Sequence, residues 1–286
     1  MRFGFHISIG GGFHRVAERA RRLGCQTIQI FSHNPRQWKS SSFTEDEVKM
    51  FKEDIEKEEI HPVFVHMPYL PNLASPEESL YSKSVESLCQ DLIRTGILAI
   101  PYLVIHLGSR GNSDEGEALA RISQAINEVF VRVRNGVIIL LENAAGQGTE
   151  VGYTFSQIKA ISDQVEDKNR IGVCLDTAHA FEAGYDLSRE KGLEGTIEDF
   201  DRLIGLEKLY LIHLNDSKTS LGSRVDRHWH IGDGHIGLEG FRRIVNHRQL
   251  LHLPVIMETP RQDDGDDLRN MSVIKKLIGT RNVNRI

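Results

Sequence analysis

Short apolar runs rich in β-branched residues recur eight times along this chain, and an amphipathic stretch follows each of them. Strands are expected over 2–9, 26–32, 61–66, 101–107, 137–143, 171–176, 209–215 and 254–259. In the intervening stretches, such as 13–23 and 119–129, apolar residues recur about every 3.6 positions, which predicts helices. Alternation of strand and helix indicates parallel pairing, and eight such units favour a closed (β/α)8 barrel over an open doubly wound sheet.

The whole chain, 1–286, is expected to form one α/β domain of the TIM-barrel type. Its length suits a single barrel, and no linker, low-complexity segment or charged tail divides it. Helix starts are predicted at Thr44, at Ser75-Pro76 and at Ser113, each of which precedes an acidic first turn. The glycine run 10–12 lacks the remainder of a dinucleotide-binding fingerprint.

Six consecutive predicted strands end in a histidine, an aspartate or a glutamate. These residues are His66, His106, Glu142, Asp176, His213 and Glu258. The carboxyl ends of the strands surround the active site of a (β/α)8 barrel, so the six side chains are expected to lie together. A single polar residue at such a position can be explained as the end of its strand. Six residues in succession, all of types that bind metals, cannot be explained in this way. Carboxylates crowded in this way would destabilise the fold without a cation, which predicts a buried polynuclear metal site.

The segment 209–237 adds further ligands to this site. After the apolar run that ends near His213, a polar loop carries Asp226 and His228, and His179 lies three residues beyond Asp176. Imidazoles and carboxylates bind divalent zinc or manganese, and a loop that follows a strand can direct them to one point. Cys174, two residues before Asp176, is expected to pack inside the barrel.

Composition indicates where the protein acts in the cell more than what it does. No run approaches eighteen apolar residues, and the first residues do not resemble a signal peptide. The three cysteines, Cys25, Cys89 and Cys174, are far apart and odd in number, which is typical of reduced thiols in a cytoplasmic protein. The net charge of −5 argues against a purely electrostatic nucleic-acid binder, but three divalent ions in one cleft would more than cancel it.

Long motifs in this chain resemble those of endonuclease IV, the zinc-dependent apurinic/apyrimidinic endonuclease family. They are VHMPYLPNLAS, HLGS, ENAAGQG, CLDTAHAFEAGYD, HLNDSKTSLGSRVDRHWHIGDGHIG and ET, in the expected order within 61–259. The opening GFHISIGGGF and the segment IQIFSHNPRQW also fit. The family's fold is a (β/α)8 barrel, the same fold that the strand pattern predicts.

The resemblance implies a set of ligands for three zinc ions per chain. His66, His106 and Glu142 would hold the first, and Glu142 would bridge to a second that Asp176, His213 and Glu258 also bind. The third would be held by His179, Asp226 and His228. All nine positions carry the family's residue types. Glu142 is then expected to act as a bridging ligand, with a hydroxide held between the first two ions.

The resemblance also implies how DNA is held. Arg36 and Gln37 after the second strand, and Tyr69 and Leu70 after the third, match residues that enter the duplex beside the lesion. From the residues alone, the favoured interpretation is an exposed loop charge for Arg36 and a packing aromatic for Tyr69. Lys218, Arg224 and Arg227 in the loop near Asp226 are candidate phosphate contacts, and solvated loop charges are an equal alternative for them.

The remaining histidines are assigned more modest roles. His6 ends the first strand and is a candidate for contact with the ligands, and Arg227 is a weaker candidate for the same role. Surface or structural roles are expected for His14, His33, His61, His230, His235, His247 and His252.

The activity implied is DNA repair: hydrolysis of the phosphodiester bond 5′ to an abasic site in duplex DNA, or action at blocked 3′ ends. The products would be a 3′-hydroxyl and a 5′-deoxyribose phosphate, and the chain is expected to be a monomer. Two alternatives remain open. A sugar-phosphate isomerase or epimerase on the same barrel would need only Glu142, Asp176, His213 and Glu258 with one metal, and a DNA-damage binder would lack catalysis.

Overall fold

Eight parallel strands form the centre of the computed structural model, which describes residues 1–38 and 42–279. The strands are β1 (Arg2–Phe5), β2 (Ile28–Phe31), β3 (Val63–His66), β4 (Tyr102–Ile105), β5 (Ile138–Glu142), β6 (Ile171–Asp176), β7 (Leu209–His213) and β10 (Pro254–Met257). Each lies within a predicted run, and their order in the sheet is β1-β10-β7-β6-β5-β4-β3-β2. The predicted (β/α)8 barrel is therefore confirmed.

The barrel closes where β1 meets β2, at the one place where neighbours in the ring are joined by an isolated bridge. His6 and Gln29 pair there in parallel register, and the Ile7 amide donates to the Gln29 carbonyl at 2.7 Å. The other seven neighbouring pairs form parallel ladders, of which that between β6 and β7 shifts register between Val173 and Cys174. We call the β1–β2 junction the seam.

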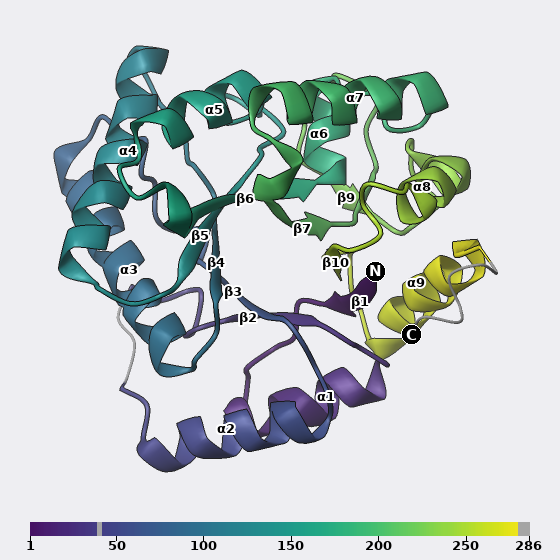
Figure 1. Ribbon diagram of the computed structural model, residues 1–286, viewed down its shortest axis with the longest axis horizontal. Helices are drawn as coiled ribbons and strands as arrows, with labels where there is room; N and C mark the ends of the chain where they lie inside the picture. The colour runs from purple at the N-terminus through teal and green to yellow at the C-terminus, as the bar shows by residue number, and fades with distance from the viewer. Residues whose placement is uncertain (39–41, 280–286) are drawn as a thin grey trace.

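Helices surround the strands in the order expected for alternating units (Figure 1). Those in the described residues are α1 (Val16–Arg22), α2 (Glu45–Lys57), α3 (Glu78–Ile97), α4 (Glu115–Arg132), α5 (Phe155–Gln164), α6 (Thr177–Ala183), α7 (Glu190–Leu203), α8 (Gly237–Asn246) and α9 (Asp264–Leu277). The short helix α6 was not expected; it begins directly after β6, and the Asp176 carboxylate caps it by accepting the His179 amide at 2.8 Å.

Of the three predicted helix starts, the first is confirmed and the other two are wrong by one or two residues. Thr44 caps α2 in a reciprocal capping box with Glu47. Helix α4 is capped by Asp114, because the Ser113 hydroxyl instead donates to the Arg110 carbonyl. Helix α3 begins after Glu77, whose amide donates to the Ser75 hydroxyl, so the serine closes a turn before the helix.

A two-stranded hairpin leaves the barrel after β7. Its strands, β8 (Asp216–Ser217) and β9 (His228–Trp229), pair antiparallel. Two residues per strand are too few for the alternation of apolar and polar side chains to predict them. The Asp216 carboxylate accepts the backbone amides of Gly232, Gly234 and Ile236, which ties the end of the hairpin to the start of α8.

The hydrophobic core has two parts. The larger lies between the strands and the helices. The smaller, which we call the inner core, fills the barrel and consists of Phe64, Val104, Leu140, Cys174, Leu211 and Ile256. Each of these six residues is fully buried, and the predicted packing role of Cys174 is confirmed.

Candidate metal centre

The six strand-end residues predicted as ligands form a layer directly above the inner core. Each follows an inner-core residue by two positions: Phe64 and His66, Val104 and His106, Leu140 and Glu142, Cys174 and Asp176, Leu211 and His213, Ile256 and Glu258. Side chains two apart on a strand share a face, so a residue packed inside the barrel places the next one inside as well. The inner core thus directs six side chains of metal-binding types to one point.

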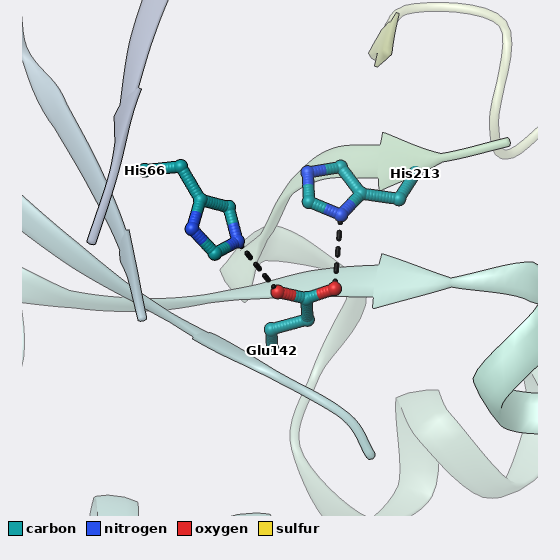
Figure 2. Close-up of side chains that lie close together, drawn as sticks. All are labelled: His66, Glu142 and His213. Atoms are coloured by element: carbon teal, nitrogen blue, oxygen red, sulfur yellow. Dashed lines mark hydrogen bonds and ion pairs between the residues drawn. The ribbon is translucent and has the colours of Figure 1, made fainter. Parts of the chain in front are cut away.

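Glu142 lies at the centre of this layer and contacts histidines on both sides (Figure 2). Its Oε2 is 3.0 Å from His66 Nε2 and 3.4 Å from His106 Nδ1. Its Oε1 is 3.0 Å from His213 Nδ1 and 3.6 Å from His179 Nδ1. One carboxylate therefore faces two separate groups of imidazoles, the arrangement that a bridging ligand requires.

Backbone carbonyls orient two of the imidazoles. His66 Nδ1 lies 2.6 Å from the Met67 carbonyl, so Nδ1–H donates to it and Nε2 is left as the ligand atom. His179 Nδ1 donates in the same way to the Asn143 carbonyl at 2.8 Å. Hydrogen bonds of this kind fix the tautomer and ring orientation of metal-binding histidines.

Two buried asparagines hold the carboxylates, and sequence reasoning missed both. Asn143 exchanges hydrogen bonds with the backbone of Asp176. Asn215 donates to Asp176 Oδ2 at 2.6 Å and accepts the Glu258 amide at 2.7 Å. Their positions in the sequence could have indicated this role, because Asn143 follows Glu142 directly and Asn215 lies two residues after His213. An amide is a poor metal ligand, so neither residue stood out.

The hairpin brings the remaining ligands to the edge of the layer. His228 Nε2 is 3.1 Å from His179 Nε2 and 3.6 Å from Asp176 Oδ2. Asp226 Oδ1 lies 3.5 Å from His179 Nε2 and 3.9 Å from His228 Nε2. Buried Glu182 supports the loop by accepting the Ser217 hydroxyl and the Arg227 amide. All nine side chains predicted from the sequence are therefore brought together.

Electrostatics in this centre are dominated by contacts between carboxylates and imidazoles. Burial alone would raise the pKa of Glu142, but His106, His213 and His66 hold it well below its ordinary range. Burial opposes the charged form of His179 too, yet Asp176 and Asp226 raise the pKa of this imidazole well above 6.5. The pKa of Asp226 falls to about 2, since the hydrogen bond and charge of His179 outweigh desolvation.

The donor set fits divalent cations. Among residues 1–38 and 42–279, no lysine or arginine lies within ion-pair distance of Glu142, Asp176, Asp226 or Glu258. Buried carboxylates usually have a cationic partner or a metal. Three groups have ligand atoms close enough to share one ion: His66, Glu142 and His213; Asp176, His179 and His228; and Glu142, Asp176, His213 and Glu258. The assignment of particular ligands to particular ions stays a prediction.

The residues predicted to contact DNA lie on loops around this layer. Arg36 and Gln37 are exposed, Leu70 is half-buried, and Tyr69 is 64% exposed. A packing role for Tyr69 is therefore wrong, because its ring contacts little of the protein. Exposed Lys218 and Arg224 lie over the rings of Trp229 and Tyr153, and Arg227 donates to the Asp226 carbonyl at 2.6 Å.

His6 is placed beside the ligands, as expected for a supporting residue. Its Nδ1 lies 3.4 Å from Glu258 Oε1 and 3.0 Å from the amide nitrogen of Gln29. His33 is buried and contacts Asp91, which agrees with a structural role. No helix in the described residues is long and apolar enough to cross a membrane.

Comparisons with known proteins agree with this geometry. The family described as xylose isomerase-like TIM barrel matches residues 17–277. A probable endonuclease 4 of Halothermothrix orenii is 45% identical, with 96% of this chain and 100% of that protein covered. Endonuclease IV from Thermus thermophilus superposes with a TM-score of 0.87 at 36% identity, over 97% of this chain and 98% of that one. A D-tagatose 3-epimerase-like protein, 19% identical with a TM-score of 0.72 over 97% of each chain, shares the fold. The chain belongs to the endonuclease IV family of xylose isomerase-like TIM barrels.

Proposed function

We propose that this protein is a zinc-dependent endonuclease that hydrolyses the phosphodiester bond 5′ to abasic sites in duplex DNA. The observation that carries the proposal is the set of nine convergent ligand side chains, seven of them in clusters that could each hold an ion and His106 and Asp226 in contact with those clusters, together with the exposed loops beside the set. Membership of the endonuclease IV family supports the same activity. We further propose that 1–286 acts as one domain and as a cytoplasmic monomer.

Three zinc ions per chain are part of the proposal. His66, His106 and Glu142 would hold one, Glu142 with Asp176, His213 and Glu258 a second, and His179, Asp226 and His228 a third. Zinc supplies a nucleophile at neutral pH, neutralises phosphate charge and stabilises a departing alkoxide. The protein's part is to hold the ligands with their lone pairs directed inward, which the carbonyls of Met67 and Asn143 do for two of the imidazoles.

The exposed loops would select the substrate. Tyr69 offers a large ring to the duplex beside the damaged position, and Arg36 offers a cation to the phosphates. A nucleotide without its base has no pairing and little stacking to lose, so moving it out of the helix costs less than moving an intact one. In the reaction, water oxygen joins phosphorus and the bond from phosphorus to the 3′ oxygen breaks. The products are a 3′-hydroxyl and a 5′-deoxyribose phosphate.

A sugar-phosphate isomerase or epimerase is the competing function, because Glu142, Asp176, His213 and Glu258 form a cluster sufficient for one metal. It leaves the second cluster, Asp176 with His179 and His228, without a purpose. A protein that binds damaged DNA without catalysis would be supported by the loss of one of the metal ligands, and all nine ligand positions are filled.

The test uses a labelled duplex with one abasic site. Zinc-loaded protein is expected to cut it 5′ to the lesion without added magnesium, since the ligand set is rich in histidine. Treatment with a chelator is expected to abolish cleavage, and added zinc to restore it. Absolute dependence on millimolar magnesium, or turnover of a ketose phosphate in place of DNA, would exclude the proposal.

A further inference from the structure

Gln29 completes the polar layer from the side of the seam. It lies on β2 and is fully buried. Its amide is directed toward two members of the group Glu142, Asp176, His213 and Glu258, which we call the central cluster. Its Oε1 is 2.8 Å from His213 Nε2, and its Nε2 is 2.7 Å from Glu258 Oε1. The same nitrogen lies 3.0 Å from His6 Nδ1.

The chemistry of these neighbours allows only one orientation of the amide. The ionised carboxylate of Glu258 can only accept, so the group that faces it must be the amide NH2. The amide oxygen therefore faces His213, and His213 Nε2 must carry the hydrogen. The second amide hydrogen is available to His6 Nδ1, which accepts it.

This orientation decides which atoms of the two ligands are free. His213 with its hydrogen on Nε2 has a lone pair on Nδ1, and Nδ1 is the atom 3.0 Å from Glu142 Oε1 and 3.2 Å from Glu258 Oε2. With Glu258 Oε1 occupied by the amide, Oε2 is the oxygen left facing the cluster. Both free atoms thus point to the same position, shared with Glu142 and Asp176.

We infer that Gln29 is a positioning residue for the metal bound by Glu142, Asp176, His213 and Glu258: its one amide fixes the tautomer of His213 and the coordinating oxygen of Glu258. The inference rests on the zinc sites of the proposed function. Supporting hydrogen bonds of this kind typically change metal affinity by roughly 10- to 100-fold when removed. Gln29 is thus expected to act on metal retention more than on folding.

The decisive variant is Gln29→Met, which nearly keeps the side-chain volume and removes the hydrogen bonds of the amide to His213, Glu258 and His6. Zinc affinity is measured by competition with a chromophoric chelator, and the cobalt-substituted protein is measured by its visible absorption. The expected result is roughly 10- to 100-fold weaker binding of one ion, with an altered cobalt spectrum and the other two ions retained. Gln29→Glu, which keeps an acceptor for His213 but places a second carboxylate against Glu258, is expected to show the same loss and replaces the methionine variant if that one does not fold.

Thr27→Val is the matched control. Thr27 is also fully buried two residues earlier, and its hydroxyl donates to the Pro62 carbonyl, away from the ligands. It is expected to lower thermal stability while all three ions are retained. The inference is overturned if Gln29→Met binds zinc within twofold of the unaltered protein, or if Thr27→Val loses as much zinc. An unaltered protein that holds no zinc would instead overturn the proposed function.

Discussion

Replacing Asp226 and His228 together by alanine is the most discriminating change to the candidate site. Both belong to the hairpin edge, and neither lies among the four residues of the central cluster. The Asp226 side chain is 44% exposed and that of His228 is 19% exposed. Removing them costs the hydrogen bond from His228 Nδ1 to the Glu258 carbonyl, at 3.2 Å, which contributes about 1 kcal/mol to stability. The barrel should therefore stay folded.

The expected consequence is the loss of one zinc ion and a large fall in rate. The His179 imidazole would lose its contact with Asp226 and keep those of its Nδ1 with Glu142 Oε1 at 3.6 Å and with Asp176 Oδ1 at 3.9 Å. Loss of one electrostatic partner of a departing oxygen typically costs roughly 10²- to 10³-fold in rate, about 2.7 to 4 kcal/mol. An isomerase that uses the central cluster alone would be almost unaffected.

The assay is single-turnover cleavage of an abasic duplex, with zinc content measured on the same preparation. Leu221→Ala, in the same loop and 44% exposed, serves as the control and should keep all three ions. Cleavage within threefold of the unaltered protein after one zinc is lost would refute the three-metal assignment.

The remaining predictions concern the DNA-binding loops, the protonation of His179 and the contact of Asn215 with Glu258. Arg36→Ala and Tyr69→Ala should weaken binding to abasic duplex at least tenfold with zinc content unchanged, as measured by titration and elemental analysis; unchanged binding would make both ordinary surface residues. Because the pKa of His179 is raised well above 6.5, zinc must displace the proton of this imidazole at any pH below that raised value. Zinc affinity should therefore rise with pH throughout that range, by as much as about tenfold per pH unit for one proton; a chelator competition with no such slope would contradict this. The same raised pKa stabilises the metal-free fold fully below about pH 6.5, and that stabilisation is lost as pH rises through the folded value. Asn215→Ala leaves the Glu258 amide without its acceptor and should lower the free energy of unfolding by about 1–3 kcal/mol in denaturant titrations.

The strands were predictable because a parallel barrel repeats one simple pattern. On β3, β4, β5, β6, β7 and β10, a ligand such as His66 or Glu142 stands two residues after an apolar residue of the inner core. Helix starts were less certain, since Ser113 and Asp114 can both cap a helix and the choice depends on which local acceptor is free.

Parts of the site could not be predicted because their roles depend on contacts between distant segments. Gln29 meets His213 across 184 positions of sequence, and nothing near Gln29 marks it as more than a polar residue in a strand. The hairpin β8–β9 is held by the Asp216 carboxylate and by Glu182, both of which act on a loop with no periodic pattern. Such side chains are recognised only when the elements they join are in place.

If the centre binds zinc as proposed, the seam should link ring closure to metal occupancy thermodynamically. The Gln29 carbonyl accepts the Ile7 amide that joins β1 to β2, while the side chain of the same residue holds His213 and Glu258. Any ion that binds only the closed form lowers the population of locally opened molecules. The Ile7 amide is consequently a reporter of zinc loading, and its hydrogen exchange should slow as the centre fills, even though it belongs to no metal ligand.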